Sequence, residues 1–365
     1  MSTSPPAPTG ALRIGRVAGV PVYLDRTWLL LAALFAYTGF QAGQWRGTGT
    51  GVAFAVGNVV SIFVAVIGHE VGHALSARGL GFRVHQVVAT VWGGHTSFDG
   101  TGATPGRSAV VALAGPLVNV GLAVVGFVVA VTAGGLTADF AGYFGYLNAA
   151  LAVFNLLPGL PLDGGAAVQS LVWALSGRRD LGMLVAGWIG RAVAVVVLVL
   201  FTAVPLLRGD RADLWTVAIG LLMAWILWTG ATGAIRRAGL ERVLDTVRVG
   251  DAAERAVVLP ADTPLSVART SPDLVVCLDE RGVPSLVLRA VSPSVPDTTP
   301  LGAVVTRIPD ENVVETGPDA GIGAVLRAMS ATGVGVVVVT LGGAPWGLVA
   351  GEGVDAAAKR VRART

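Results

Sequence analysis

Charged residues are scarce in this chain. They make up 13% of its 365 residues, whereas soluble proteins carry roughly 25%. Hydrophobic residues make up 53%, and the mean hydropathy is +0.69. This composition excludes a disordered chain, a coiled coil and an ordinary soluble enzyme. Of the 49 charges, 24 lie between Thr246 and Thr365. The composition therefore predicts a membrane protein with a soluble C-terminal part.

Cysteine and lysine are nearly absent. Cys277 is the only cysteine, which excludes an intramolecular disulfide. Lys359 is the only lysine against 25 arginines, a codon bias that indicates a GC-rich bacterial genome. The net charge is +3, but no basic cluster is interleaved with aromatic residues, so we expect no nucleic-acid partner. The N-terminal residues lack the charged-then-apolar order of a cleaved signal peptide.

Six apolar segments approach the length of about 20 residues that a helix needs to cross a bilayer. A further segment, Pro158–Gly177, holds too many prolines and glycines for a full span. We expect it to form a re-entrant loop and a partial helix, which persist at membrane depth only under a cover of protein. The sequence therefore predicts a polytopic α-helical membrane protein. The six candidate spans are Trp28–Gly43, Gly51–Ala77, Ser108–Ala133, Phe140–Leu157, Trp188–Leu207 and Leu214–Ile235.

Arginines favour one side of this bundle. If the six segments alternate in direction, most arginines outside them fall on the same side, which the positive-inside rule assigns to the cytoplasm. Arg191 is counted with them, in the expected first turn of the fifth helix. The opposite side holds Arg46, together with Arg208 and Arg211, whose charges two aspartates offset. We therefore expect a multi-pass protein of the plasma membrane with both termini in the cytoplasm.

The composition changes to a soluble α/β pattern near Thr246. Two segments, Leu259–Leu288 and Glu315–Gly351, each show the order turn, helix, strand, polar glycine turn, strand. Their spacing of about 60 residues indicates a tandem repeat. This pair resembles two cystathionine-β-synthase-type (CBS) modules, at 246–305 and 306–365. The predicted domains are then an N-terminal tail and strand pair at 1–26, a transmembrane domain at 27–240, and the CBS-like pair at 246–365.

The CBS-like pair departs from the pattern that binds adenine nucleotides. In that pattern a strand ends in Gly-Ile-Val-Thr-x-x-Asp, and the Asp holds the ribose hydroxyls. Here Ala350 and Gly353 stand at the Thr and Asp positions. The missing hydrogen bonds are worth about 1–3 kcal/mol, so we expect little or no nucleotide binding. We expect the pair to form a homodimer or to gate substrate, through a face built from Leu274–Leu278 and Val334–Val339.

All four histidines lie within 27 positions, and two belong to the motif His69-Glu70-x-x-His73 at the end of an apolar run. Residues four apart share one face of a helix, so both imidazoles can reach one Zn²⁺ with Glu70 beside it as general base. A charge inside a hydrophobic helix costs at least ~2.5–3.5 kcal/mol, which makes the motif more specific here than in a soluble chain. The alternative is an interfacial helix end at which these side chains are merely solvated.

A catalytic zinc site needs a third protein ligand and an open position for water. Asp163 is the only charged residue between Phe140 and Gly177. A carboxylate isolated in so apolar a stretch needs a partner, which a metal bound to the two histidines would supply. Neighbouring prolines and glycines break the helix, so the backbone can turn the carboxylate inward. The alternative is that Asp163 caps a helix starting near Gly165.

These motifs together resemble the site-2 protease family of intramembrane zinc metalloproteases. The His-Glu-x-x-His motif stands in the second apolar segment, and Asn155–Gly165 carries Asn-x-x-Pro-x-x-Pro-Leu-Asp-Gly-Gly. Ala114–Asn119 resembles the family's Gly-Pro-x-x-Asn motif in the third helix, and Gly15–Leu30 resembles its short strand pair. A C-terminal CBS pair occurs in one subgroup. The resemblance covers about Gly15 to Leu240.

The resemblance implies one Zn²⁺ per chain, held by His69, His73 and Asp163, with Glu70 as the general base. The family's arginine after Leu-Asp-Gly-Gly is replaced by Ala166. That position is not a ligand, so the departure leaves the implied metal site intact.

Several other polar or glycine positions are candidates for substrate contact. The resemblance places a double glycine in the loop beside the site. The asparagines in the apolar helices either bridge helices or hold the backbone of an unwound substrate, and the resemblance favours Asn119 for substrate. His95 is either a fourth zinc ligand or an interfacial histidine. The substrate candidates are Gly93, Gly94, Asn119, Asn148 and Asn155.

The predicted function is hydrolysis of a peptide bond inside the membrane or at its cytoplasmic edge. The implied substrate is a single-span membrane protein whose helix unwinds locally, such as an anti-sigma factor already trimmed by another protease. One alternative is a CBS-regulated ion or metal transporter that uses His69, His73 and Asp163 as transit ligands, although the other spans hold few charges for its pathway. Another is a catalytically silent receptor, against which the complete set of ligands and base argues.

Overall fold

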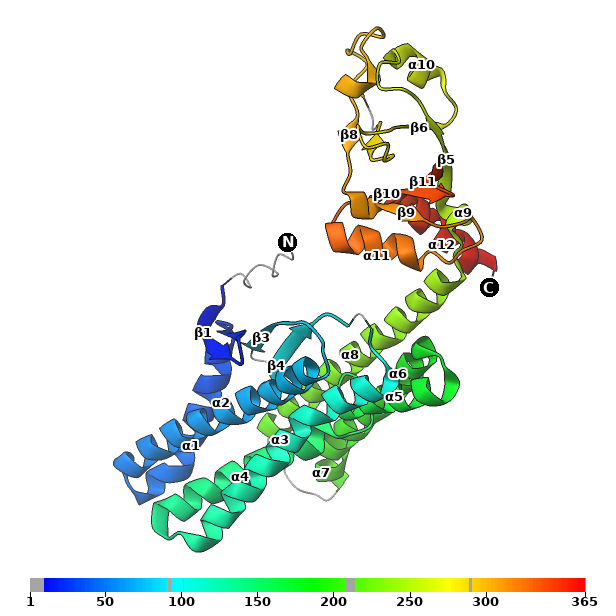
Figure 1. The fold of residues 1–365 in the computed structure, drawn as a ribbon. Coiled ribbons are helices and arrows are strands. Elements are labelled where there is room, and N and C mark those ends of the chain that lie inside the picture. Colours follow the sequence, from blue (N-terminus) through cyan, green and yellow to red (C-terminus); the bar gives the residue numbers. More distant parts are fainter. Residues whose placement is uncertain (1–9, 91–92, 101, 208–213, 289–290, 365) are drawn as a thin grey trace. The chain divides into compact units, whose positions relative to one another are not determined.

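The computed structural model describes residues 10–90, 93–100, 102–207, 214–288 and 291–364 (Figure 1). By its contacts the chain divides into two compact units, Met1–Ala238 and Gly239–Thr365. Most of the expected N-terminal tail, and the expected outside arginines Arg208 and Arg211, lie outside the described residues. The predicted boundaries at 1–26, 27–240 and 246–365 stay predictions.

The first unit is a bundle of helices formed by the long apolar runs of the sequence. Helix α3 shows how such a run begins. It starts at Pro105, directly after the N-cap residue Thr104, whose side chain accepts a hydrogen bond from the Arg107 N–H. The helices are α1 (Trp28–Gly43), α2 (Thr48–Gly79), α3 (Pro105–Thr132), α4 (Gly135–Asn155), α5 (Asp163–Ser176), α6 (Arg179–Leu198), α7 (Val204–Leu207) and the part of α8 (Leu214–Thr246) up to Ala238.

Four helices in the described residues are long and apolar enough to cross a membrane, rather than the six expected. They are Thr48–Gly79, Pro105–Thr132, Arg179–Ala203 and Trp215–Thr246. Helix α1 has 16 residues, about 24 Å, which is shorter than the ~30 Å hydrocarbon core. Helix α4 contains the polar residues Asp139 and Asn148. Helices α1 and α4 pack along α2 and α3.

Helix α6 starts nine residues earlier than predicted, at Arg179 instead of Trp188. Arg191 was expected in the first turn of this helix and instead lies more than three turns from its start. The sequence pattern missed this because the amphipathic stretch before Trp188 is less hydrophobic than the span. The predicted partial helix after Pro158 is present as α5, which ends at Gly177 in the left-handed conformation, at φ 71°.

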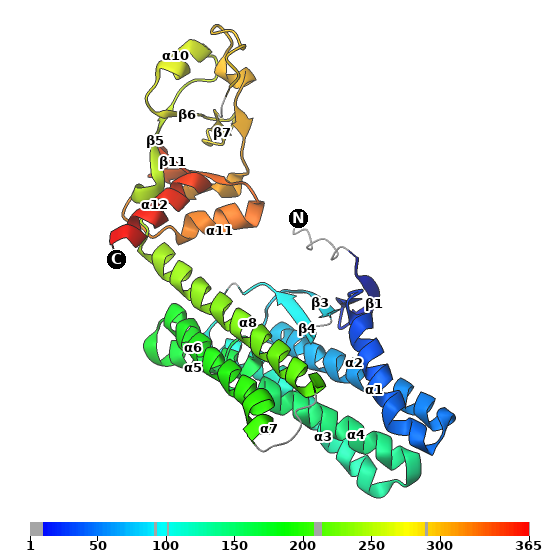
Figure 2. The same cartoon turned by 180° about the vertical axis from the view of Figure 1, so that it is seen from behind.

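A four-stranded sheet packs against α2 at one end of the helices (Figures 1 and 2). The expected N-terminal strand pair is present and antiparallel, the second strand runs parallel to the third, and the third and fourth are antiparallel. The double glycine expected in a loop begins an edge strand instead. The strands are β1 (Leu12–Val17), β2 (Val20–Leu24), β3 (Val84–Thr90) and β4 (Gly93–Phe98), in that order.

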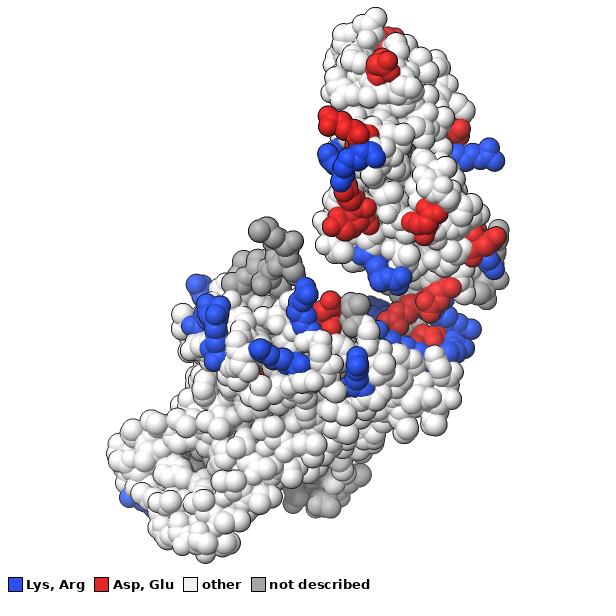
Figure 3. Space-filling model, viewed as in Figure 1, with Lys and Arg blue, Asp and Glu red and all other residues white. Residues whose placement is uncertain are grey.

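Basic side chains of the first unit gather at the end that carries the sheet. The rest of the face seen in Figure 3 carries almost no charge over the length of the helices. One ion pair at the other end joins Arg46 to Asp139, between the start of α2 and the start of α4. The bundle therefore has one arginine-rich end, as the sequence predicts.

The second unit is built on a seven-stranded sheet in the order β8-β7-β6-β5-β11-β10-β9. Its two halves have the same order of elements. In each half a helix connects two parallel strands, and the second of these strands pairs antiparallel with the strand that follows it. The elements are α9 (Val249–Ala252), β5 (Ala253–Val258), α10 (Leu265–Thr270), β6 (Leu274–Cys277), β7 (Leu286–Val287), β8 (Thr306–Arg307), β9 (Val313–Glu315), α11 (Gly323–Thr332), β10 (Val336–Leu341), β11 (Ala344–Ala350) and α12 (Gly351–Arg364).

The strands expected to form a dimer face lie in the core of this unit. Val276, Cys277 and Val337–Val339 are fully buried. They pack against helices and strands of the same unit. The prediction that Leu274–Leu278 and Val334–Val339 build the packing face of a dimer is therefore wrong, because both sides of these strands are covered by residues of the same unit.

Candidate metal centre

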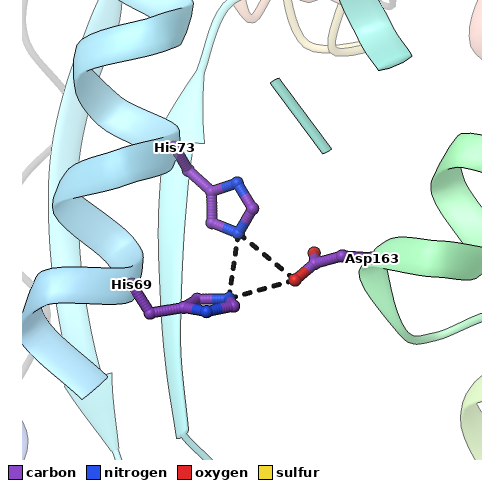
Figure 4. A group of neighbouring side chains, drawn as sticks. All are labelled: His69, His73 and Asp163. Atoms are coloured by element: carbon purple, nitrogen blue, oxygen red, sulfur yellow. Dashed lines mark hydrogen bonds and ion pairs between the residues drawn. The ribbon is translucent and has the colours of Figure 1, made fainter. Parts of the chain in front are cut away.

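Three of the predicted site residues meet at one point. His69 and His73 lie one turn apart on α2, and Asp163 is the first residue of α5 (Figure 4). The Oδ2 atom of Asp163 is 3.0 Å from His69 Nε2 and 3.4 Å from His73 Nε2. The two Nε2 atoms are 3.1 Å apart. The fold thus brings together one ligand atom from each of the three residues.

The far nitrogen of each imidazole donates a hydrogen bond to a fixed acceptor. His69 Nδ1 lies 2.6 Å from Asn119 Oδ1, and the amide group of Asn119 is oriented by its own donation to the Ala65 carbonyl at 3.1 Å. His73 Nδ1 donates to the Val111 carbonyl at 2.7 Å. In a neutral imidazole with its proton on Nδ1, Nε2 carries a lone pair. Both lone pairs therefore point toward the carboxylate.

Three acceptor atoms facing one another repel unless a cation lies between them. Asp163 Oδ2 is buried and has no hydrogen-bond donor in the described part of the chain. A buried carboxylate oxygen without a partner is costly. Two imidazole nitrogens and one carboxylate oxygen are the donor set of many catalytic zinc sites, in which the fourth position is left for water. The residues present therefore fit a bound Zn²⁺.

Gly115 on α3 leaves the space that such an ion would need. A Cβ atom at this position would lie 2.4 Å from His73 Nε2 and 2.7 Å from His69 Nε2. These are the two atoms that face the carboxylate, so any side chain at 115 would fill the position between the ligands. The close passage of α3 across α2 is thus part of the construction of the site.

Glu70 lies beside the ligands in a buried position, with 5% of its surface exposed. The Thr96 hydroxyl on β4 lies 2.8 Å from Glu70 Oε2 and donates to it. Gly94 on the same strand passes so close that a Cβ atom there would lie 2.2 Å from Glu70 Cγ. The edge strand β4 therefore fixes the carboxylate of Glu70 from one side.

Asp163 does not cap its helix. Helix α5 begins at Asp163 itself, its N-cap residue is Leu162, and no side-chain cap hydrogen bond is present. The carboxylate is directed at the histidines instead, which disagrees with the capping alternative. Interfacial solvation of the motif is also excluded, because His69 and Glu70 are buried.

Asn119 is placed behind the metal site and not on an open surface. It is completely buried, and its amide group donates to the Asn148 Oδ1 atom at 2.9 Å as well as to Ala65. Asn148 in turn donates to the Phe144 carbonyl. Both asparagines bridge helices, and Asn119 has no polar atom left for the substrate contact that the resemblance favoured.

The remaining candidates lie apart from the three ligands. Gly93 starts β4 at φ 107°, with its carbonyl 3.1 Å from the Thr90 hydroxyl that donates to it. Asn155 is half-buried at the end of α4, and its side chain makes no hydrogen bond to another described residue. His95 is exposed and is not a member of the ligand group. Its neighbour Thr96 faces Glu70, so alternation along the strand directs His95 away.

Sequence reasoning missed two residues that build the site. Thr96 gives no signal, because its contact with Glu70 depends on the register of the β3–β4 pair. Gly115 lies inside the motif Ala114–Asn119, and a Gly-Pro pair within an apolar helix could have indicated a close helix contact.

Comparisons with known proteins agree with this geometry. The model of peptidase family M50 matches residues 57–140 and 130–201. A candidate zinc metalloprotease of Synechocystis sp. is 30% identical over 263 residues, which are 68% of this chain and 66% of that protein. A candidate zinc metalloprotease of Mycobacterium tuberculosis is 30% identical over 253 residues, which are 66% and 63%. The chain thus spans slightly less than two thirds of these relatives.

A solved structure, the site-2 protease from Methanocaldococcus jannaschii, aligns with a TM-score of 0.45 at 22% identity, over 62% of this chain and 95% of that one. At this level the assignment depends on the sequence relatives and the family model. The matched ranges contain the His-Glu-x-x-His motif on α2 and the carboxylate that meets it at the start of α5. Over these ranges the chain is similar to peptidase family M50.

Proposed function

We propose that this protein is an intramembrane zinc metalloprotease that cleaves within or next to the membrane segment of a single-span protein. The observation that carries the proposal is the convergence of three possible metal-ligand atoms, one each from His69, His73 and Asp163, beside a buried Glu70. Two of the ligands lie on a helix long and apolar enough to cross a membrane. The match to the model of family M50, and the similarity to relatives described as zinc metalloproteases, support the same function.

The residues of the site divide the work of peptide hydrolysis. Zinc held by His69, His73 and Asp163 would polarise the scissile carbonyl and make its water a nucleophile at neutral pH. Glu70 accepts the proton of the attacking water and returns it to the leaving amine. Thr96 holds one oxygen of Glu70 and so leaves the other for the proton. The hydrogen bonds that the two Nδ1–H groups donate keep both imidazoles in the ligand tautomer.

The substrate must reach this site in an extended form, because the backbone of an intact helix is closed to attack. A single-span protein that unwinds locally, such as an anti-sigma factor already trimmed by another protease, fits this requirement. Gly93 and Gly94 on the edge strand are the proposed contacts for its backbone, together with Asn155. Edge strands commonly pair with extended peptides.

The arginine-rich end of the bundle is proposed to face the cytoplasm, with both termini on that side of the plasma membrane. A cysteine introduced at Gly79, at the end of α2, should react with membrane-impermeant thiol reagents only after the membrane is permeabilised. Labelling of that cysteine from outside intact cells would contradict this orientation.

The second unit is proposed to be a CBS-like pair that associates with a second copy or gates substrate, without adenine nucleotide. Calorimetry on the full chain should give no micromolar binding of ATP or AMP, because Ala350 and Gly353 replace the usual contacts. Micromolar binding would make this unit a nucleotide sensor.

The decisive experiment uses Glu70→Gln in the full chain, reconstituted with a tagged single-span reporter. Loss of the base should lower turnover about 10²–10⁴-fold, while the zinc content stays at one per chain. Glu280→Gln, an exposed change in the second unit, is the matched control and should keep full activity. If the Glu70→Gln protein still cleaves at the wild-type rate, the proposal fails.

The alternative of a zinc transporter is tested in the same vesicles. A transporter would move zinc across the membrane without cleaving the reporter. Zinc flux in the absence of proteolysis would favour that alternative.

A further inference from the structure

Arg191 is a cation inside a membrane-spanning helix that the metal site does not use. It lies on α6, within the candidate span Arg179–Ala203. Charged groups in such helices usually pair with an opposite charge, because an unpaired charge at membrane depth is costly. Arg191 has no carboxylate partner in the part of the chain that the structure describes. Among the described residues, no negative charge therefore compensates its positive charge.

Two indole rings and one hydroxyl surround the guanidinium group. Its Cζ atom stands 4.7 Å from the ring centre of Trp188 on the same helix and 4.9 Å from that of Trp228 on α8. One nitrogen donates to the Thr232 hydroxyl on α8 at 3.1 Å, while Nε is buried without an acceptor. Aromatic faces stabilise a cation, but they accept few of its five N–H bonds. The group keeps several donors and a full charge.

The cluster is open toward the surface of the bundle. The residues Trp188 and Trp228 are 56% and 45% exposed. Tryptophan collects at the boundary between headgroups and acyl chains. On α8, Arg236 lies one turn beyond Thr232 on the same face and is exposed. A second positive charge therefore stands on the side of Arg191 that leads out of the membrane.

Exposed apolar side chains lead away from the cluster in the opposite direction. Along the span Arg179–Ala203, Val195 on α6 and Val199 just after its end follow Arg191 at successive turns, and both are exposed. On α8, Trp225 and Leu221 precede Trp228 at successive turns and are exposed as well. A positive group flanked by indoles at one end of an apolar track matches the shape of a lipid, with a charged head and a long tail.

We propose that Trp188, Arg191, Trp228 and Thr232, the Arg191 cluster, bind the phosphate of an anionic phospholipid. The phosphate oxygens accept hydrogen bonds from the free guanidinium N–H groups, in the geometry that arginine and phosphate favour. The acyl chains lie along the exposed residues of α6 and α8. A net negative headgroup is expected because Arg191 lacks a counter-charge among the residues that the structure describes.

Helices α6 and α8 also hold the loop that presents the metal ligand Asp163. A Cβ atom at Gly190, next to Arg191, would lie 2.0 Å from the Leu160 carbonyl oxygen, and one at Gly230 would lie 2.6 Å from Pro161. A lipid that joins the two helices at the Arg191 cluster therefore braces the segment before Asp163. Binding should raise the thermal stability of the full chain.

Lipid retention by the purified full chain in detergent tests this site. Native mass spectrometry with phosphatidylglycerol, phosphatidylcholine and inorganic phosphate should show preferential retention of phosphatidylglycerol. Arg191→Gln should weaken that retention by at least about tenfold, the lower end of the value of one charged hydrogen bond. Arg237→Gln removes an equal charge from an exposed position on α8 and should retain the lipid like the wild type.

Three outcomes would overturn the proposal. They are equal retention of phosphatidylglycerol by Arg191→Gln and wild type, equal retention of both lipids by wild type, and displacement of the lipid by millimolar phosphate, which would indicate a site for free anions. A second measurement avoids dependence on the Arg191 variant. Brominated phosphatidylglycerol should quench tryptophan fluorescence more than brominated phosphatidylcholine in wild type. Persistence of that difference after Trp188→Phe and Trp228→Phe together would also refute the site.

Discussion

Replacing Gly115 with alanine should close the metal site while leaving helix α3 intact. The new methyl group would lie 2.4 Å from His73 Nε2 and 2.7 Å from His69 Nε2, whereas ordinary contact begins at 3.4 Å. One imidazole would have to withdraw by about 1 Å, and metal–ligand distances tolerate only ~0.2 Å. At least one ligand is then lost. Gly115 has an ordinary helical backbone conformation, and alanine favours a helix by about 1 kcal/mol over glycine.

The expected result is a fall in zinc affinity of at least about 100-fold, because even the loss of a residue that only supports a ligand costs 10–100-fold. Metal content after equilibration with a graded series of chelators measures this affinity. Gly121→Ala is the matched control, since it lies on the same helix with nothing within 4 Å of its Cβ position. Protease resistance and thermal unfolding of both variants monitor the fold.

Two results would refute this reasoning. One is a Gly115→Ala protein that binds one zinc per chain with wild-type affinity, which would mean that the ion does not lie between the three ligand atoms. The other is an equal loss of zinc in Gly121→Ala, which would trace the effect to the helix and not to the site.

Three further changes test the surroundings of the site and the second unit. Asn119→Ala should lower zinc affinity about 10–100-fold in chelator competition, because one imidazole loses its acceptor, while Asn155→Ala should not. Thr96→Val should lower turnover about tenfold at unchanged zinc content, because the general base loses a charge-assisted hydrogen bond, and Thr96→Ser should restore it. Backbone N–H groups and arginines hold the pKa of Asp279 at about 2, below its usual 3.8. The stability it contributes is present above pH 4 and is lost as the pH falls toward 2. Protease resistance of the second unit should follow that loss, and Asp279→Asn should remove this pH dependence.

The metal ligands could be predicted because the sequence marks them in two ways: by a short spacing along one helix, or by a single charge in an apolar stretch. A four-residue spacing on a helix fixes the relation of His69 to His73, and Asp163 stands out as the only charge in a long apolar stretch. The positions of Asn119 and Thr96 could not be predicted in the same way. Each depends on how one element passes another, the crossing of α3 over α2 and the register of β4 against β3. Neither relation produces a periodic pattern of residues in the sequence.

The carboxylate of Asp163 illustrates how a ligand is positioned by its backbone and not by a hydrogen-bond donor to its own oxygen. Its Oδ2 atom has no donor in the described residues, so the backbone that carries it must be fixed by other contacts. The Leu160 N–H donates to the Ala186 carbonyl on α6 at 3.1 Å, and the Leu162 N–H donates to the Gly159 carbonyl at 3.0 Å. Gly164 and Gly165 allow the turn before α5 to fold back on itself, since a Cβ atom at either would lie within 2.3 Å of Leu156, Gly159 or Leu160 backbone atoms. In an apolar medium, close backbone contact avoids the cost of burying further polar groups. The ligand is thus held for the metal by glycines, and a bulkier residue at either position should displace Asp163 even though it touches no ligand.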